Sequence, residues 1–161
     1  MTAMVKNLIA LGDGLRVCVE VESASSQGLR IRSLDLRRTR NSPHFPASTW
    51  VPWQMRILSR RLTLKSEKLE VVDYDPIREL GLLRSAPVLE EPWKEYFELS
   101  LDQGFRIVLR RFAYDPAQGR KREIAFGLSQ EDLLELVDEL GQVLKESPER
   151  EEQEPAFQQA A

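Results

Sequence analysis

Residues 105–136, FRIVLRRFAYDPAQGRKREIAFGLSQEDLLEL, constrain the fold more than any other stretch of this chain. Apolar and basic residues alternate along 105–114, which is the period of a strand with one buried face. The alternation breaks at a turn around 115–119, resumes as a second strand, and then changes to the period of a helix. The stretch therefore predicts an antiparallel hairpin followed by a helix that covers it.

The hairpin extends a series of short strands. The segment YFELSL and a turn at 102–104 come directly before it, which predicts an antiparallel meander of three strands. Ser129 offers an N-cap for the helix, with Asp132 three residues later. One helical stripe is apolar and consists of Leu133, Leu136, Val137, Leu140 and Leu144. We therefore expect an α+β fold in which a curved antiparallel sheet packs against a C-terminal amphipathic helix.

The upstream half is also rich in strand patterns. LRVCVEV, residues 15–21, alternates strictly. The following strand shifts its apolar phase after Ile31, which predicts a β-bulge because the shifted residues would otherwise face solvent. Residues 41–53 contain three prolines and predict a loop, followed by strands at 55–64 and 68–73. Asp75-Pro76 predicts the start of a short helix that ends near Arg84.

With 161 residues, the chain can bury one core but is short for two ordinary domains. We predict a single globular domain over residues 1–146, with two β-rich halves joined around 74–94, and an acidic disordered tail over 147–161. No apolar run approaches the roughly 20 residues that span a bilayer. The single cysteine, Cys18, favours a reducing cytoplasm.

The charge is unevenly distributed, although the net charge is only -3. Residues 28–65 contain nine Lys or Arg against one Asp, and residues 105–122 contain six against one Asp. The carboxylates concentrate in the C-terminal helix and the tail. This pattern indicates either a basic working face on an acidic protein or a surface on which the two sets form ion pairs.

The sequence shows neither a nucleophile with a matching base nor a cluster of metal ligands, and hydrolases and transferases usually need one of these. His44 is the only histidine, and zinc sites use three or four N or S ligands, so we interpret it as a loop residue or a polar contact. The carboxylates of Asp73, Asp75 and Glu79 suit a metal site, but a capped helix start explains Asp75 as well. We therefore expect no enzyme activity, no cofactor and no metal.

Alternation divides the strand 105–114 between two faces. One face carries Phe105, Ile107, Leu109 and Ala113, which we expect to meet the helix; the other carries Arg106, Val108, Arg110, Phe112 and Tyr114. Arg111 falls out of phase with the outward arginines. Trp50 and Trp53, in the proline-rich segment, either stack on bases or close the edge of the core.

The stretch 105–144 resembles the positive-cofactor-four transcriptional coactivators and, more distantly, the Whirly proteins, which bind single-stranded nucleic acid. The match consists of Phe105, Arg106, Ile107, Leu109, Arg110 and Phe112 in a strand, Gly119, Arg120 and Lys121 in a basic turn, and Leu128, Ser129 and Glu131 at the helix start. The resemblance implies a curved antiparallel sheet with a helix behind it, dimerisation through helices, and nucleic acid on the sheet face.

These observations together favour a non-catalytic, homodimeric protein that binds single-stranded DNA or RNA. The expected phosphate contacts are Arg30, Arg32, Arg37, Arg38, Arg60, Arg61, Arg106, Arg110 and Lys121, and the expected stacking residues are Phe112, Tyr114 and Trp53. The alternative is a protein-interaction module that binds an acidic partner through its basic face or a strand edge. The tail, with Phe157 after four glutamates, resembles the partner-binding tails of bacterial single-strand-binding proteins.

Overall fold

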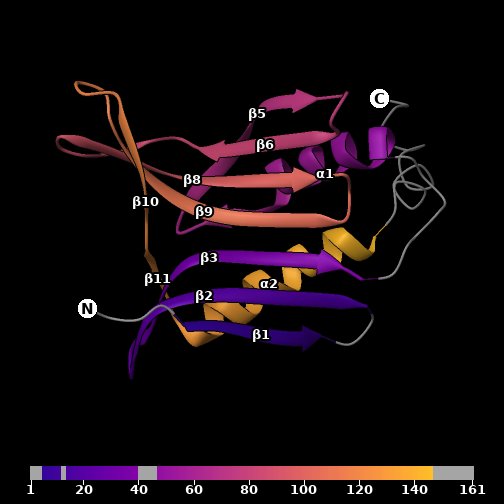
Figure 1. Ribbon diagram of the computed structural model, residues 1–161, viewed down its shortest axis with the longest axis horizontal. Coiled ribbons are helices and arrows are strands. Elements are labelled where there is room, and N and C mark those ends of the chain that lie inside the picture. The colour runs from indigo at the N-terminus through magenta and orange to yellow at the C-terminus, as the bar shows by residue number, and fades with distance from the viewer. Residues whose placement is uncertain (1–4, 12–13, 40–46, 147–161) are drawn as a thin grey trace, which may run out of the picture.

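The computed structural model describes residues 5–11, 14–39 and 47–146, with side chains described for 14–39 and 50–146. An antiparallel sheet with the strand order β1-β2-β3-β9-β8-β6-β5-β4 forms the centre of the fold (Figure 1). Outside this path, β10 pairs with β9, β11 with β3, and β7 with β8. The strands are β1 Val5–Leu11, β2 Leu15–Ser25, β3 Gly28–Arg38, β4 Thr63–Leu64, β5 Glu67–Asp75, β6 Leu80–Ser85, β7 Val88–Glu90, β8 Trp93–Asp102, β9 Arg106–Asp115, β10 Arg120–Ile124 and β11 Phe126–Leu128. The helices are α1 Ala47–Arg61 and α2 Gln130–Lys145.

The sheet curls around both helices, so the predicted α+β class with a curved antiparallel sheet and a C-terminal helix is confirmed. Each helix contacts strands from both halves of the chain. Helix α1 follows β3 but packs on β5, β6 and β8, whereas α2, at the C-terminal end, packs mainly on β3 (Figure 1). The two helices also contact each other. We call the sheet surface turned away from them the outer face.

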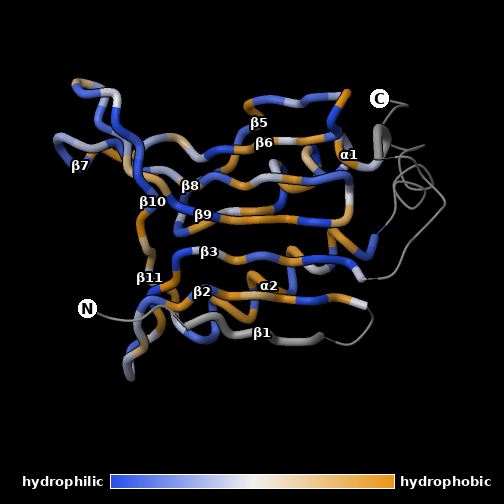
Figure 2. Tube along the Cα trace, viewed as in Figure 1, coloured by the Kyte–Doolittle hydropathy of each residue, from blue (hydrophilic) through white to orange (hydrophobic). Residues whose placement is uncertain are grey.

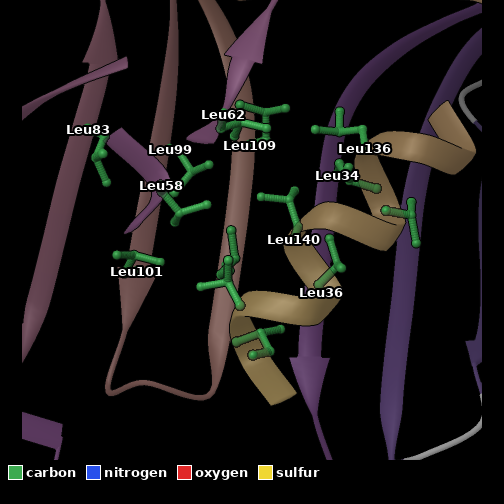
Figure 3. Close-up of a cluster of buried hydrophobic side chains, with 14 of the residues drawn as sticks. Leu34, Leu36, Leu58, Leu62, Leu83, Leu99, Leu101, Leu109, Leu136 and Leu140 are labelled. Carbon is green, nitrogen blue, oxygen red and sulfur yellow. The ribbon is translucent and has the colours of Figure 1, made fainter. Parts of the chain in front are cut away.

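The core lies between the inner face of the sheet and the helices. Leu136 and Leu140 of α2 lie beside Leu34 and Leu36 of β3 (Figure 3). On the α1 side, Leu58 is 1 % exposed and belongs to the same buried cluster. Along the strands, hydrophobic and hydrophilic residues alternate (Figure 2). Burial of one strand face and one helical stripe is the main stabilising contribution expected for such a layered fold.

The structure confirms the strand pattern at the N-terminal side. In β2, Leu15, Val17 and Val19 are buried, as the alternation predicts. The bulge is also present, because the pairing of β2 with β3 shifts on both sides of Val21. The two residues left out of the pairing, Glu22 and Arg32, form an ion pair at 3.2 Å.

The meander β8-β9-β10 and the C-terminal helix are confirmed too. The N-cap of α2 is Ser129, whose Oγ accepts a hydrogen bond from the Asp132 backbone N–H at 3.0 Å. The stripe from Leu133 to Leu144 is buried. The predicted tail, 147–161, lies outside the described residues.

For residues 41–64, the prediction is wrong over the described residues 47–61 and right at 63–64, which form strand β4. Instead of a proline-rich loop and a strand over 55–64, the chain forms helix α1, with Pro52 inside it. The buried side chains recur at three- and four-residue spacing, at Trp50, Val51, Gln54, Met55 and Leu58. This helical period outweighs the loop signal of the prolines.

The helix predicted to follow Asp75-Pro76 is also wrong. The structure has a tight turn at 76–79 and then strand β6. Asp75 caps that turn, because its Oδ1 accepts hydrogen bonds from the backbone N–H groups of Ile77 and Arg78. Asp before Pro is compatible with both structures. Gly81 brings β6 close to α1, since a Cβ there would lie 2.6 Å from Met55 Sδ.

Candidate functional site

The outer face carries a groove of about 440 Å³ across β2, β3 and β9, which we call the arginine groove. The strand register sets its composition, because Arg37 lies opposite Arg106, and Ser33 lies opposite Arg110. Side chains at alternate positions of each strand share a face, so the three strands contribute polar residues to one surface. The lining residues are Arg16, Cys18, Glu20, Ser33, Asp35, Arg37, Arg106, Val108 and Arg110.

Asp35 orders the middle of the groove. Its carboxylate accepts two hydrogen bonds from Arg106, at 3.1 and 2.8 Å, and Arg37 lies 3.5 Å away. Burial alone would raise the pKa of Asp35, but the hydrogen bond and charge of Arg106, followed by those of Arg37, lower the pKa below its usual value. The same hydrogen bond raises the pKa of Arg106. Asp35 therefore holds two guanidinium groups side by side.

The remaining arginines of the groove are less constrained. Arg110 has an exposed side chain that lies 4.0 Å from Glu123, the limit of an ion pair. Arg16 has no ion-pair partner among the described residues. The groove thus contains four guanidinium groups against the carboxylates of Asp35 and Glu20, and this excess favours an anionic ligand.

Aromatic residues continue the outer face beyond the arginines. The rings of Tyr96 and Phe112, paired across β8 and β9, lie 6.1 Å apart between centroids. The Lys121 ammonium lies 4.1 Å from the Phe112 centroid and 3.3 Å from Glu98 Oε1. We call Tyr96, Phe112 and Lys121 the Phe112 platform. Tyr96 is only 6 % exposed, so the half-buried ring of Phe112 is the surface that a base can reach, beside the Lys121 cation. A ring beside a cation is the combination that single-strand binding sites use.

Six predicted site residues lie on the outer face, around the arginine groove and the Phe112 platform: Arg37, Arg106, Arg110, Phe112, Tyr114 and Lys121. The predicted division of β9 is confirmed for its centre, because Ile107, Leu109 and Ala113 are buried. Phe105, just before the strand, is half-buried.

The other predicted residues lie elsewhere. Arg30 and Arg32 are at the bulged end of β3, where both contact Glu22. Arg60 and Arg61 end α1, and Arg61 lies 3.5 Å from Glu146 after α2. The twelve predicted residues therefore do not form one continuous surface.

Two residues on the helix side have structural roles. Trp53 is only 4 % exposed, so the expectation that it stacks on bases is wrong, and the alternative of a core residue is confirmed. Arg38 stacks over the Trp50 ring at 4.1 Å and donates a hydrogen bond to the Leu144 carbonyl. Burial lowers the pKa of Arg38.

Three residues that lie beside the predicted set were missed. Arg16 alternates with the buried residues of β2 and lies on the same face as Cys18, a pattern that is visible in the sequence. Tyr96 has the same phase as Phe112, but only the pairing of β8 with β9 brings them together. Trp93 contacts Arg122, with 4.4 Å between the guanidinium carbon and the ring centroid.

The residues considered for metal binding do not converge. Within the described part of the chain, no group of three or more His, Cys, Asp or Glu side chains is arranged to hold a metal ion. The Asp75 carboxylate is used in the turn before β6. Cys18 is half-buried at the groove, and His44 lies outside the described residues. Neither described helix has the length and apolar character needed to cross a bilayer.

Comparison of the chain with protein-family models, with curated proteins and with solved structures gives no match.

Proposed function

We propose that this protein binds single-stranded DNA or RNA along the outer face of its sheet, without catalysis. The observation that carries the proposal is the continuity of the arginine groove with the Phe112 platform on one face. Arginines attract the phosphate backbone, and ring surfaces accept unpaired bases, at about 1–3 kcal/mol per base.

Single strands suit this surface better than duplexes. The bases of a duplex are stacked on each other, and its edges are read by side chains that enter a groove. The outer face instead presents the half-buried Phe112 ring beside a row of guanidinium groups. When a base stacks on Phe112, Lys121 moves off the ring and exchanges Glu98 for a phosphate.

The test is a titration of labelled oligo-dT, oligo-rU and duplex DNA, followed by fluorescence anisotropy at about 50 and 200 mM salt. We expect both single strands to bind more tightly than the duplex. If four arginines contact phosphates, the logarithm of the affinity falls with the logarithm of salt with a slope of about -2 to -3. Absence of binding to all three probes at 50 mM salt would contradict the proposal.

Matched arginine variants locate the site. Arg16→Ala and Arg110→Ala remove exposed guanidinium groups from the arginine groove, so each is expected to weaken binding and reduce the salt slope by about 0.7. Arg61→Ala removes an exposed arginine from the end of α1 and is expected to leave affinity unchanged. Equal effects of the three variants would exclude the outer face as the site.

A protein-binding role is the second candidate, and β5 provides a specific observation for it. Among the described strands, β4 pairs only with Glu67 and Lys68 of β5, so the rest of that edge has no neighbour. Val71 and Val72 are about half exposed there, at 52 % and 47 %. Glu70 and Asp73 lie in the same segment, so this edge suits a basic extended partner. An acidic partner would instead use the arginine groove.

We also propose that the protein forms a homodimer. The resemblance implies that helices from two chains come together, whereas here α1 and α2 of one chain contact each other and cover one sheet. Their apolar stripes belong to the same core cluster. Light scattering after size-exclusion chromatography measures the mass directly; a mass near 18.6 kDa would contradict the dimer.

A further inference from the structure

We propose that Trp93 and Arg122 form a second base-stacking site, on the opposite side of the sheet from the Phe112 platform. The inference rests on the proposed function and extends it, because it assigns part of the bound strand to a different surface. Its basis is the contact between the Trp93 ring and the Arg122 guanidinium, at 4.4 Å.

The register places the two stacking sites on opposite faces. Phe112 pairs with Tyr96, and Trp93 is three residues before Tyr96 in β8, so its side chain points to the other face. Likewise, Lys121 reaches Phe112 on the outer face, and the next residue, Arg122, reaches Trp93. Each face of this end of the sheet thus has one ring with one cation.

This end of the sheet is accessible from both sides. Figure 1 shows β10, the turn between β9 and β10, and the turn between β7 and β8 extending past the two helices. Trp93 is half-buried and Arg122 is exposed, and Arg120 of the same strand is exposed as well. The hairpin end is also largely hydrophilic (Figure 2). A ring that lies outside the helix-covered core is available to a ligand.

A flexible strand can connect the two sites. Among the described strands, β10 pairs with β9 alone, so the second edge of β10 has no neighbour. A single strand that contacts Lys121 can pass around this edge and reach Arg122, the adjacent residue. A duplex is too stiff for such a path, because its persistence length is about 150 base pairs. The ligand class is therefore a single-stranded oligonucleotide long enough to reach both faces.

The tryptophan content makes the site measurable. The chain has three tryptophans, and Trp50 and Trp53 are 2 % and 4 % exposed. A change in emission that arises from base stacking therefore reports on Trp93. In the experiment, unlabelled oligo-dT is titrated into the full-length protein and emission is followed, while labelled oligo-dT is followed in parallel by anisotropy.

We expect oligo-dT to quench the tryptophan emission with the same midpoint as the anisotropy change. In the Trp93→Phe variant, we expect no quenching. Trp93→Ala is expected to weaken binding by about 5- to 150-fold, the equivalent of one stacked base. If Trp93→Ala does not fold, as judged by circular dichroism, acrylamide quenching of the wild-type protein serves instead. Bound oligo-dT is then expected to protect Trp93 from acrylamide.

The outcomes separate this inference from the proposed function. Binding by anisotropy without a change in emission or in acrylamide protection would overturn the second site and leave the outer-face site intact. Wild-type affinity in a folded Trp93→Ala protein would overturn it as well. No anisotropy change at all would overturn both proposals.

Discussion

Arg110 and Arg111 are adjacent in β9 but face opposite sides of the sheet. We therefore expect substitution of Arg111 to lower stability and substitution of Arg110 to weaken binding. The Arg111 side chain is 11 % exposed. Its guanidinium group lies 3.1 Å from Glu67 and 3.4 Å from Glu95, and it stacks over Phe97 at 4.4 Å. Arg111→Ala should therefore destabilise the fold, whereas Arg110→Ala should act on binding.

The expected loss in the free energy of unfolding follows from the two carboxylates that Arg111→Ala leaves without their cation. Without Arg111, the carboxylates of Glu67 and Glu95, 15 % and 27 % exposed, lose their cation. Removal of one partner from such a buried pair costs about 3–5 kcal/mol, and two partly exposed partners favour the lower end. Arg110 is exposed and weakly paired, so its removal should change the free energy of unfolding by about 0.5 kcal/mol or less.

Urea unfolding measured by circular dichroism gives both free energies. With a slope of about 1–3 kcal/mol/M, Arg111→Ala should lower the midpoint by at least about 1 M. A double-mutant cycle with Glu67→Ala should return a coupling of about 0.5–3 kcal/mol. A loss below about 1 kcal/mol for Arg111→Ala, or equal losses for the two arginine variants, would refute the reasoning.

Three further changes test other parts of the fold. Ser129→Ala removes the N-cap of α2 and should cost about 1 kcal/mol in urea unfolding. Burial, then Glu135 and Asp138, raise the pKa of Glu139, so Glu139→Gln should stabilise the protein at pH 7, a gain that disappears in acid. Because Glu139 is exposed, solvent screening limits this gain to about 0.2 kcal/mol. The pKa of Asp35 is lowered, so its contribution is present above about pH 4 and lost as pH falls further. Asp35→Asn should flatten acid unfolding measured below pH 4; an unchanged acid profile would contradict this role.

Much of the sheet was predictable because alternation is a local signal. In β2 and β9, each apolar residue and its polar neighbour already indicate which side chain is buried. The bulge near Ile31 was visible for the same reason, since only an irregular residue reconciles its phase with that of Leu34. The helix after Ser129 combined a cap with an apolar stripe.

Helix α1 and strand β6 were not predictable because their local signals conflict. The prolines before Trp53 and the Asp75-Pro76 pair are compatible with several structures, and packing decides among them. The same holds for the candidate site. Arg16 and Arg106 are 90 positions apart in the sequence, and only the order β2-β3-β9 places them in one groove.

The contacts of each helix with strands from both halves have a consequence for folding. A cut between the halves, for example at residues 86–87, keeps α1 with β5 and β6, but it separates α2 from β3 and α1 from β8. It also divides the strand pairs β3 with β9 and β6 with β8. Neither fragment is expected to fold alone, and mixing the two should restore the native circular dichroism spectrum. The intact chain must close contacts between its distant ends before either layer is complete, so it should unfold as one cooperative unit and refold slowly for its size.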